Sequence, residues 1–307
     1  MRTTIPPSPP FSKFGNILMA FKNISASFDT SAHEFLHFAR EFILENEAEN
    51  NLIASLALGV ASGKFQGTGA TYMRITEHNR LLAAALQTRP DNILLAKSST
   101  PDCWEVLAKN LFDSQHRFSG VIGPTLDVEA FARHWCKLSR KHALVAMQLV
   151  IFRLDQVVQP TKSLGALKQA HLSDLAIVED WILDFQKEAL PNESQSDSDL
   201  RALAKNKVEA GSIYLLLVGN SAVSLAARSG ETPNGARIGT VYTPKHLRKK
   251  GYASEITAKL SQLILDRGKK FCTLYTDKGN PTSNKIYQDI GYRPISESLN
   301  IQFTDPT

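Results

Sequence analysis

The segment from Gly239 to Ser254 has the residue types of an anion-binding site. A β-rich run leads into a basic, glycine-containing turn, and a helical pattern follows. Free backbone N–H groups at a helix N-terminus, together with the positive end of the helix dipole, bind phosphate groups. Gly251 lets the main chain approach such a group closely. Arg248, Lys249 and Lys250 add positive charge suited to a pyrophosphate.

The pattern R-x-x-G-x-A at Arg248 is by itself equally compatible with a solvated basic loop. A second segment downstream reads Asn280-Pro-Thr-Ser-Asn-Lys-Ile-Tyr287 and continues to Gly291-Tyr292. Together the two segments resemble the R/Q-x-x-G-x-G/A and N-x-x-A-x-x-L-Y-x-x-x-G-F patterns of the GNAT superfamily of acyl-CoA-dependent N-acetyltransferases. The departures, at Ser283, Ile286 and Tyr292, keep the size or character of the usual alanine, leucine and phenylalanine.

The resemblance implies an N-acetyltransferase that uses acetyl-CoA as its acyl donor and needs no metal. It implies that Tyr287 is the general acid that protonates the CoA thiolate; the alternative is that Tyr287 is a core aromatic at helical spacing. The amide of Asn280 is expected to bind the pantetheine arm, and a backbone N–H at Tyr242 or Thr243 to serve as the oxyanion donor. The expected cofactor-binding residues are Tyr242, Thr243, Arg248, Lys249, Lys250, Gly251, Tyr252, Ala253, Ser254, Asn280 and Ser283.

The acceptor is expected to be a primary amine of a small molecule or peptide. The amine must be neutral to attack a thioester, so a base or a water chain has to take its proton. Asp277, Glu209 and Glu231 are candidates by location alone, and their residue type and position favour ordinary surface or capping carboxylates. A different class of function, a non-catalytic acyl-CoA sensor or interaction module on the same fold, stays open because a fold and a cofactor site do not guarantee turnover.

His33-Glu34-Phe-Leu-His37 matches H-E-x-x-H, a helical zinc pair with a glutamate base. Such a short pattern also arises by chance on the exposed face of a helix. A zinc hydrolase is therefore a remote alternative.

The hydrophobic pattern predicts the elements that position these residues. In the first half, helical spacing before Gly63 is followed by β-rich runs at residues 71–76, 81–87 and 92–96. Helices are expected at 101–112 and 128–138 and a buried strand at 145–153.

The second half repeats this order after a linker or edge strand near residues 157–164. A helical face is expected at residues 175–185, a surface loop at 191–199 and a helix at 200–210. Three antiparallel strands follow, joined at Gly219-Asn220 and Asn234-Gly235. They lead to the basic turn, a helix, a strand, a short helix and a final strand.

The whole chain resembles a two-domain bacterial GNAT group, in which Glu47-Ala-Glu-Asn-Asn-Leu and N-G-A-R-I-G-x-V-Y-T-P recur. We therefore expect an α/β (α+β) protein with tandem GNAT-like domains, each a mixed, mostly antiparallel sheet flanked by helices. The expected bounds are a flexible tail at 1–28, a degenerate domain at 29–156 and a catalytic domain at 157–307. Where the first half would carry a phosphate loop it has Lys97-Ser-Ser-Thr-Pro-Asp-Cys103, so that domain is expected to bind no CoA.

Composition sets the remaining expectations. The net charge of +5 is spread along the chain, so no nucleic-acid partner is expected. The apolar runs at 52–61 and 143–152 are shorter than the roughly 18 residues of a membrane span, and no membrane partner is expected. Cys103, Cys136 and Cys272 lack C-x-x-C spacing, which favours a reducing, cytoplasmic setting. A monomer or homodimer is expected.

Overall fold

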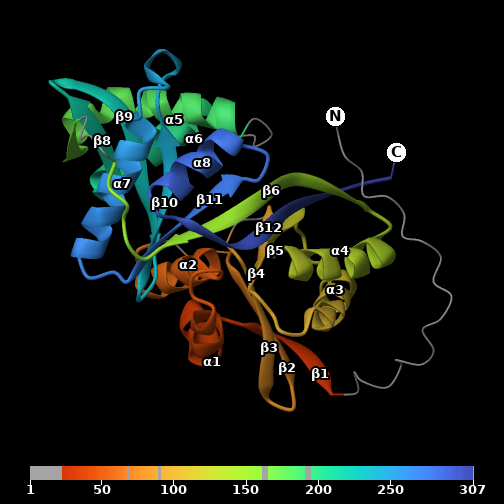
Figure 1. Cartoon of the computed structure of the whole chain (residues 1–307). Helices are drawn as coiled ribbons and strands as arrows, with labels where there is room; N and C mark the ends of the chain where they lie inside the picture. The colour runs from red at the N-terminus through yellow and green to blue at the C-terminus, as the bar shows by residue number, and fades with distance from the viewer. Residues whose placement is uncertain are drawn as a thin grey trace. The chain divides into compact units, whose positions relative to one another are not determined.

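The computed structural model describes residues 23–65, 67, 69–88, 91–160, 165–190 and 195–306 (Figure 1). Most of the expected tail, and parts of the expected linker at 157–164 and loop at 191–199, lie outside these residues. The described chain divides into two compact units. Unit 1 comprises the residues up to Leu149 together with those from Glu297 onward, and unit 2 runs from Val150 to Ser296.

Unit 1 contains a mostly antiparallel sheet with helices on both faces. Its sheet order is β1-β2-β3-β4-β5-β12, and the β4–β5 pair is parallel. The last strand comes from the far end of the chain: Ser298 to Gln302 of β12 pair antiparallel with β5. Its elements are β1 (Ile24–Asp29), α1 (Ala32–Glu45), α2 (Asn51–Ala61), β2 (Thr71–Glu77), β3 (Arg80–Gln87), β4 (Asn92–Leu95), η1 (Pro101–Cys103), α3 (Trp104–Asp113), β5 (Gly120–Pro124), α4 (Thr125–Ser139) and the first part of β6 (His142–Leu154).

The two faces of this sheet bury separate cores because alternate residues of a strand point to opposite sides. On β2, Met73 and Ile75 join the core under α3 and α4, whereas Tyr72 joins the core under α1 and α2. Trp104 and Phe131 are fully buried in the first of these cores. The strand predicted at residues 71–76 is therefore confirmed, with helices covering both sides.

Unit 2 repeats the element order of unit 1. Its strands lie in the order β11-β10-β9-β8-β7, with β6 next to β11, and the β10–β11 pair is parallel while the others in this run are antiparallel. Its elements are β7 (Ala166–Gln169), η2 (Leu172–Asp174), α5 (Leu175–Ala189), α6 (Asp197–Glu209), β8 (Ile213–Val218), β9 (Ser221–Glu231), β10 (Gly235–Tyr242), η3 (Lys245–Leu247), α7 (Tyr252–Asp266), β11 (Phe271–Asp277), α8 (Pro281–Asp289) and the first part of β12 (Arg293–Thr304).

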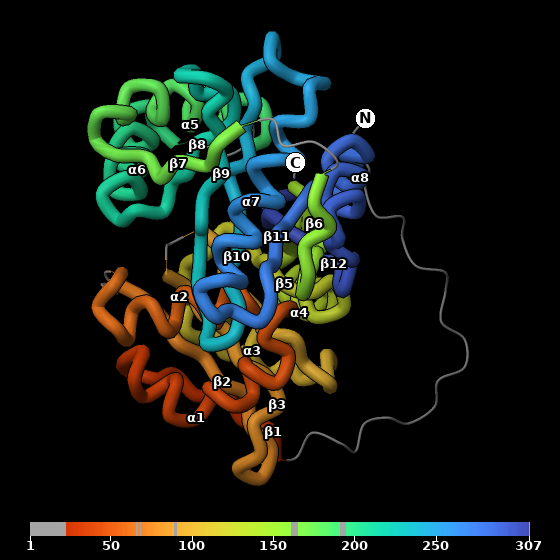
Figure 2. Tube along the Cα trace, turned by 60° about the vertical axis from the view of Figure 1, so that its left-hand side comes forward, coloured from red at the N-terminus to blue at the C-terminus, as the bar shows by residue number. Residues whose placement is uncertain are grey.

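The helices of unit 2 also cover both faces of its sheet (Figure 2). Ile256, Leu260 and Ile264 of α7 are buried with Leu274 of β11 in one core. Val178 and Ile182 of α5 are buried in the other, together with residues of α6 and of β8 to β10. Both helical faces were predicted from their spacing, and both predictions are confirmed.

The observed division of the chain differs from the expected bounds in two places. Strand β1 begins at Ile24, inside the segment expected to be a tail. Residues from Glu297 onward group with unit 1 rather than with the second half of the chain. The cause is that β12 supplies the strand beside β5, a long-range pairing that carries no local signal. Whether the units act as separate functional domains stays a prediction.

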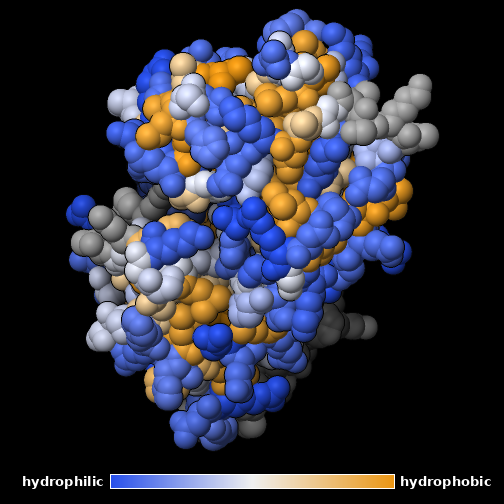
Figure 3. Space-filling model, turned by 90° about the vertical axis from the view of Figure 1, so that its left-hand side faces the viewer, coloured by the Kyte–Doolittle hydropathy of each residue, from blue (hydrophilic) through white to orange (hydrophobic). Residues whose placement is uncertain are grey.

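None of the described helices is long and apolar enough to cross a bilayer. On the face drawn in Figure 3, hydrophobic patches are broken up by hydrophilic side chains. The mixed, mostly antiparallel α/β architecture expected from the sequence is confirmed.

Candidate functional site

Strands β10 and β11 are paired along their first parts and then separate. Their pairing ends at Ile238 and Leu274, whereas β10 continues to Tyr242 and β11 to Asp277. The antiparallel pairing of β10 with β9 is irregular in the same region, because its register shifts between Gly239 and Tyr242. Parallel strands that part in this way leave main-chain N–H and C=O groups available to a ligand.

A β-bulge at Thr240 accounts for the separation. Thr240 has φ 51, a left-handed conformation that is uncommon outside glycine. Three residues of β10 advance from Gly239 to Tyr242 while β9 moves only from Ala227 to Leu225. Bulges of this kind bend a strand and re-aim its groups, and they are frequent beside active sites.

Helix α7 begins directly after the basic turn. Gly251 is the residue before the first helical position and has φ 84, which glycine adopts without steric cost. Lys249 also has a positive φ, 63, and both Lys249 and Lys250 are exposed. The N–H groups of Tyr252, Ala253 and Ser254 belong to the first turn, where helical partners are absent by geometry. This arrangement fits the anion site predicted from the sequence.

Arg248 is engaged with the protein itself. Its Nε donates to the carbonyl of Thr243 at 2.9 Å, and its Nη2 donates to Oε2 of Glu188 at 2.7 Å. Its guanidinium carbon lies 5.8 Å from the centre of the Tyr242 ring. Lys245 adds a second cation 3.8 Å from Glu188. The arginine thus links the basic turn to α5.

Tyr242 and Thr243 are held by a buried polar network at the end of β10. Ser224 of β9 is fully buried; its hydroxyl donates to the Tyr242 carbonyl at 2.8 Å and lies 2.9 Å from the Thr243 hydroxyl. The Tyr242 hydroxyl donates to Asp184 at 3.2 Å. Burial, and then the nearby Asp184 carboxylate, raise the pKa of Tyr242 to about 12. Contacts with Ser224 of β9 and with Asp184 of α5 therefore hold the end of β10 in place.

Asn280 and Ser283 open helix α8. The side-chain oxygen of Asn280 accepts a hydrogen bond from the Ser283 backbone N–H at 3.0 Å, so Asn280 is the N-cap of this helix. Pro281 occupies the first helical position, where its missing N–H has no cost. The capping role uses the oxygen of the amide. The contact of this amide with pantetheine stays a prediction.

Tyr287 lies on the inner face of α8, and only 8% of its surface is exposed. Its ring centre is 6.4 Å from that of Phe152 and 6.1 Å from that of Tyr292. Burial raises the pKa of Tyr287 to about 12, so the hydroxyl keeps its proton at any physiological pH. The side chain is a packed core aromatic. Its role as the general acid stays a prediction.

The three candidate carboxylate bases have local structural partners. Asp277 accepts the backbone N–H of Gly279 at 2.8 Å in the turn before α8. Glu231 lies 2.8 Å from Arg228 and 3.7 Å from Lys269. Glu209 lies 3.9 Å from Lys205 on the same exposed helix face. Each of the three carboxylates therefore has a structural contact, and the base that takes the proton of the acceptor amine stays unidentified.

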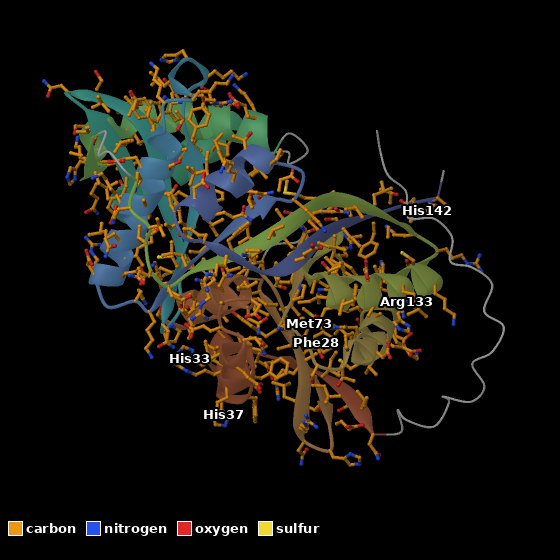
Figure 4. The ribbon with its side chains drawn as sticks, in the orientation of Figure 1. Phe28, His33, His37, Met73, Arg133 and His142 are labelled. Carbon is orange, nitrogen blue, oxygen red and sulfur yellow. The ribbon has the colours of Figure 1, made fainter. Side chains whose placement is uncertain are left out.

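The H-E-x-x-H pattern forms the N-terminus of α1. Glu34 accepts hydrogen bonds from the backbone N–H and the hydroxyl of Thr30, at 2.8 and 2.7 Å, while Ser31 accepts the Glu34 N–H at 3.1 Å. These bonds lower the pKa of Glu34. His33 and His37 lie on the exposed side of α1 (Figure 4). Within the described residues no three His, Cys, Asp or Glu side chains are grouped as metal ligands would be.

Unit 1 has a different arrangement at the corresponding place. Strands β4 and β5 pair in parallel, and the loop with Lys97 and Ser98 leads from β4 to α3. There the Asp127 carboxylate accepts hydrogen bonds from the Ser98 backbone N–H at 3.2 Å and from Nε1 of Trp104 at 2.8 Å. Asp127 of α4 therefore ties the loop after β4 to the first residue of α3.

Sequence reasoning did not identify Asp184, Glu188 or Ser224. The two carboxylates of α5 are spaced by one helical turn, and nothing in that spacing distinguishes them from ordinary surface residues. Their contacts with the end of β10 and with the basic turn depend on how α5 packs across the sheet, which requires the tertiary structure.

Comparison with known proteins finds one similar family over part of the chain and several similar folds. The model of the FR47-like protein family matches residues 208–301. No curated protein is similar to the chain in sequence. Among solved structures, a GCN5-related N-acetyltransferase from Sphaerobacter thermophilus has a TM-score of 0.61 at 13% identity, covering 93% of this chain and 97% of that one.

Two further structures share the fold over nearly the whole chain. A GNAT-family acetyltransferase from Colwellia psychrerythraea has a TM-score of 0.55 at 11% identity, covering 91% of this chain and 100% of that one. A tandem GNAT protein from the clavulanic acid biosynthesis pathway has a TM-score of 0.53 at 9% identity, covering 92% of this chain and 100% of that one. These structures show that the chain has the fold of GNAT acetyltransferases, and residues 208–301 are similar to the FR47-like protein family.

Proposed function

We propose that unit 2 is an acetyl-CoA-dependent N-acetyltransferase that transfers an acetyl group to a primary amine. The observation that carries the proposal is the separation of β10 from β11 after Ile238 and Leu274, with a helix N-terminus at Gly251 directly beyond it. The separated strands offer main-chain groups to the amide-rich pantetheine arm. The start of α7 offers N–H groups and positive potential to the pyrophosphate.

The chemistry of the described residues suits direct transfer. The neutral amine nitrogen attacks the thioester carbonyl carbon, the new C–N bond forms, and the C–S bond breaks. The leaving thiolate takes the proton of Tyr287, whose raised pKa keeps that proton available. A main-chain N–H at Tyr242 or Thr243 stabilises the oxyanion, and the acceptor nitrogen loses its proton to a base or to water.

A second candidate is a non-catalytic acyl-CoA sensor on the same fold. The observation in its favour is the packing of Tyr287 between Phe152 and Tyr292, because a tyrosine so placed contributes to the core whether or not it transfers a proton. Both candidates require the same coenzyme site and differ in turnover alone.

The two candidates are separated by measuring binding and turnover on the same preparation. Calorimetry with CoA tests the site, and release of free thiol from acetyl-CoA tests transfer, with a panel of small amines and peptides as acceptors. Binding together with acceptor-dependent thiol release supports the transferase. Tight binding without thiol release across the panel supports the sensor, and absence of binding contradicts both.

A further inference from the structure

We infer that Glu188 is a positioning residue for the coenzyme site, and that Arg248 acts on the coenzyme through the shape of the main chain rather than by contacting the pyrophosphate. The inference rests on the proposed function of unit 2. It concerns how the basic turn between β10 and α7 is held, and it assigns a role to a carboxylate on α5.

The first step is the geometry of Arg248. Its Nε–H donates to the Thr243 carbonyl and its Nη2 to Glu188, at 2.9 and 2.7 Å. The planar guanidinium directs its donors in fixed directions, so two bonds on one edge fix the orientation of the whole group. Thr243 directly follows β10, and Arg248 lies three residues before Gly251. The arginine therefore spans the turn and ties its two ends together.

The second step is the anchor on α5. Trp181, Asp184 and Glu188 follow one another at helical spacing along the side of α5 that meets the end of β10. The Trp181 and Tyr242 ring centres are 6.2 Å apart, and the Tyr242 hydroxyl donates to Asp184. Glu188 is the last member of this series and reaches Arg248. One helix thus holds both the strand end and the turn.

The third step is the energy scale. The side chains of Arg248 and Glu188 are 42% and 29% exposed, and ion pairs exposed to this degree contribute little to global stability. The same side chain also donates to the Thr243 carbonyl. Together the two contacts favour one shape of the turn, and the affinity gained cannot exceed the free energy by which they favour it. The turn contains two left-handed residues, Lys249 and Gly251, and such a conformation persists when the surroundings determine it. Preorganising a loop in its bound shape raises affinity by reducing the entropy lost on binding.

The charges around Glu188 also support a positioning role for Arg248. Glu188 neutralises Arg248 and lies near Lys245, so these cations are partly compensated before any ligand arrives. Lys249 and Lys250 are both exposed to solvent. We therefore assign the electrostatic attraction of the pyrophosphate to the two lysines and to the first turn of α7.

A double-mutant cycle tests the inference on the full chain. Kd for CoA is measured by calorimetry for the wild type, Glu188→Ala, Arg248→Ala and the double variant. If both residues act as one support, each single variant weakens binding by about tenfold and the double variant is no weaker than either single. If Arg248 contacts the pyrophosphate directly, Glu188→Ala leaves Kd unchanged or lowers it, and Arg248→Ala has the same effect in both backgrounds. That additive result overturns the inference.

Two further measurements separate positioning from charge. The salt dependence of Kd should be the same in the wild type and in Arg248→Ala, because a positioning residue contributes no ion pair to the complex. Arg248→Lys should bind CoA as weakly as Arg248→Ala, since an ammonium lacks the planar fork. A shallower salt dependence in Arg248→Ala, or full binding by Arg248→Lys, contradicts the inference.

The chain offers a matched control. Glu179 also lies on α5, and its carboxylate is 2.6 Å from Arg201 of α6, away from the basic turn. Glu179→Ala and Arg201→Ala should leave Kd for CoA unchanged. If they weaken binding as much as Glu188→Ala does, the effect is a general loss of α5 packing and the inference fails. If the wild type itself does not bind CoA, the proposed function fails instead, so the two failures are distinguishable.

Discussion

The Asp127 carboxylate accepts a hydrogen bond from the indole Nε1 of Trp104 at 2.8 Å, and both side chains are almost completely buried. The same oxygen accepts the Ser98 backbone N–H. In unit 2 the equivalent place is the basic turn before α7. The expectation that unit 1 binds no CoA stays a prediction.

Asp127 should make the stability of the protein depend on pH. Burial raises its pKa from 3.8 to about 6 in the folded state. Between these values the folded protein holds more protons than the unfolded one, so the free energy of unfolding falls as the pH rises. Above about pH 6 the free energy of unfolding is lower by about 3 kcal/mol than below about pH 4, as far as Asp127 determines it. Urea unfolding at a series of pH values measures it.

The comparison with Asp127→Asn isolates this group from every other carboxylate. Relative to the variant, the wild type should gain stability as the pH is lowered from 7 to about 4. Asparagine retains an oxygen that accepts from Trp104 and Ser98, so the local bonds are largely kept. Parallel stability profiles for the two proteins would show that Asp127 does not titrate in this window.

Gly251→Asp should abolish CoA binding and leave the fold intact. The aspartate adds bulk and a negative charge where the first N–H groups of α7 are expected to meet the pyrophosphate. The φ of 84 adds a conformational cost of about 1 kcal/mol for a residue other than glycine. Calorimetry with CoA measures the loss, and circular dichroism checks the fold.

Gly268→Asp is the control for that conformational cost. Gly268 follows the other end of α7, has φ 91, and has nothing within 4 Å of the place where a side chain would begin. The two variants therefore carry a similar backbone cost at opposite ends of one helix. Gly268→Asp should bind CoA normally; equal loss in both variants would attribute the effect to α7 as a whole and not to the anion site.

Glu34→Ala should lower the thermal stability of the protein and leave turnover of any acceptor unchanged. Glu34 bonds the main chain and the hydroxyl of Thr30 at the N-terminus of α1, and its pKa is lowered by those bonds. Since the charged form makes the bonds, the stabilisation should be lost as the pH falls through the lowered pKa. His37→Ala, on the exposed side of α1, is the control and should change neither property. A hydrolytic activity that Glu34→Ala abolishes would instead support the zinc interpretation.

The sequence predicted local structure well where one residue or turn determines it. Asn234-Gly235 and Gly219-Asn220 join neighbouring antiparallel strands as their composition indicates. Gly251 before α7 and Asn280 before α8 mark the two helix N-termini near the candidate site. Each of these signals acts within a few residues, so no knowledge of the tertiary structure is needed to interpret it.

Long-range pairings could not be predicted in the same way. The contact between Glu188 and Arg248 joins residues 60 positions apart. The pairing of Ser298 with Pro124 places the end of the chain in unit 1. The left-handed Thr240 had no local cue either, because threonine rarely adopts this conformation. The expectation that a main-chain N–H at Tyr242 or Thr243 is available came from the superfamily resemblance, and the bulge at Thr240 lies directly before these residues.

Tyr287→Phe should lower kcat by about a hundredfold or more and leave Kd for CoA nearly unchanged. The hydroxyl is expected to act when the thiolate leaves, so its loss affects the transition state more than the bound ground state. Because burial raises its pKa to about 12, loss of the tyrosine proton should not limit turnover of the wild type at any pH up to about 10. Steady-state kinetics of thiol release over this pH range measures both expectations.

Tyr292→Phe separates this chemical role from packing. Tyr292 is fully buried beside Tyr287, and its hydroxyl lies 2.9 Å from that of Ser261. Removing that hydroxyl takes one of two hydrogen bonds from Ser261, which still donates to the Thr257 carbonyl. The loss should cost about 1 kcal/mol of stability, with kcat retained in the folded protein. If the two variants lower kcat equally, Tyr287 contributes through the core alone. If Tyr287→Phe retains the full kcat, another group or water protonates the thiolate, and the candidate site then positions its substrates without a protein acid.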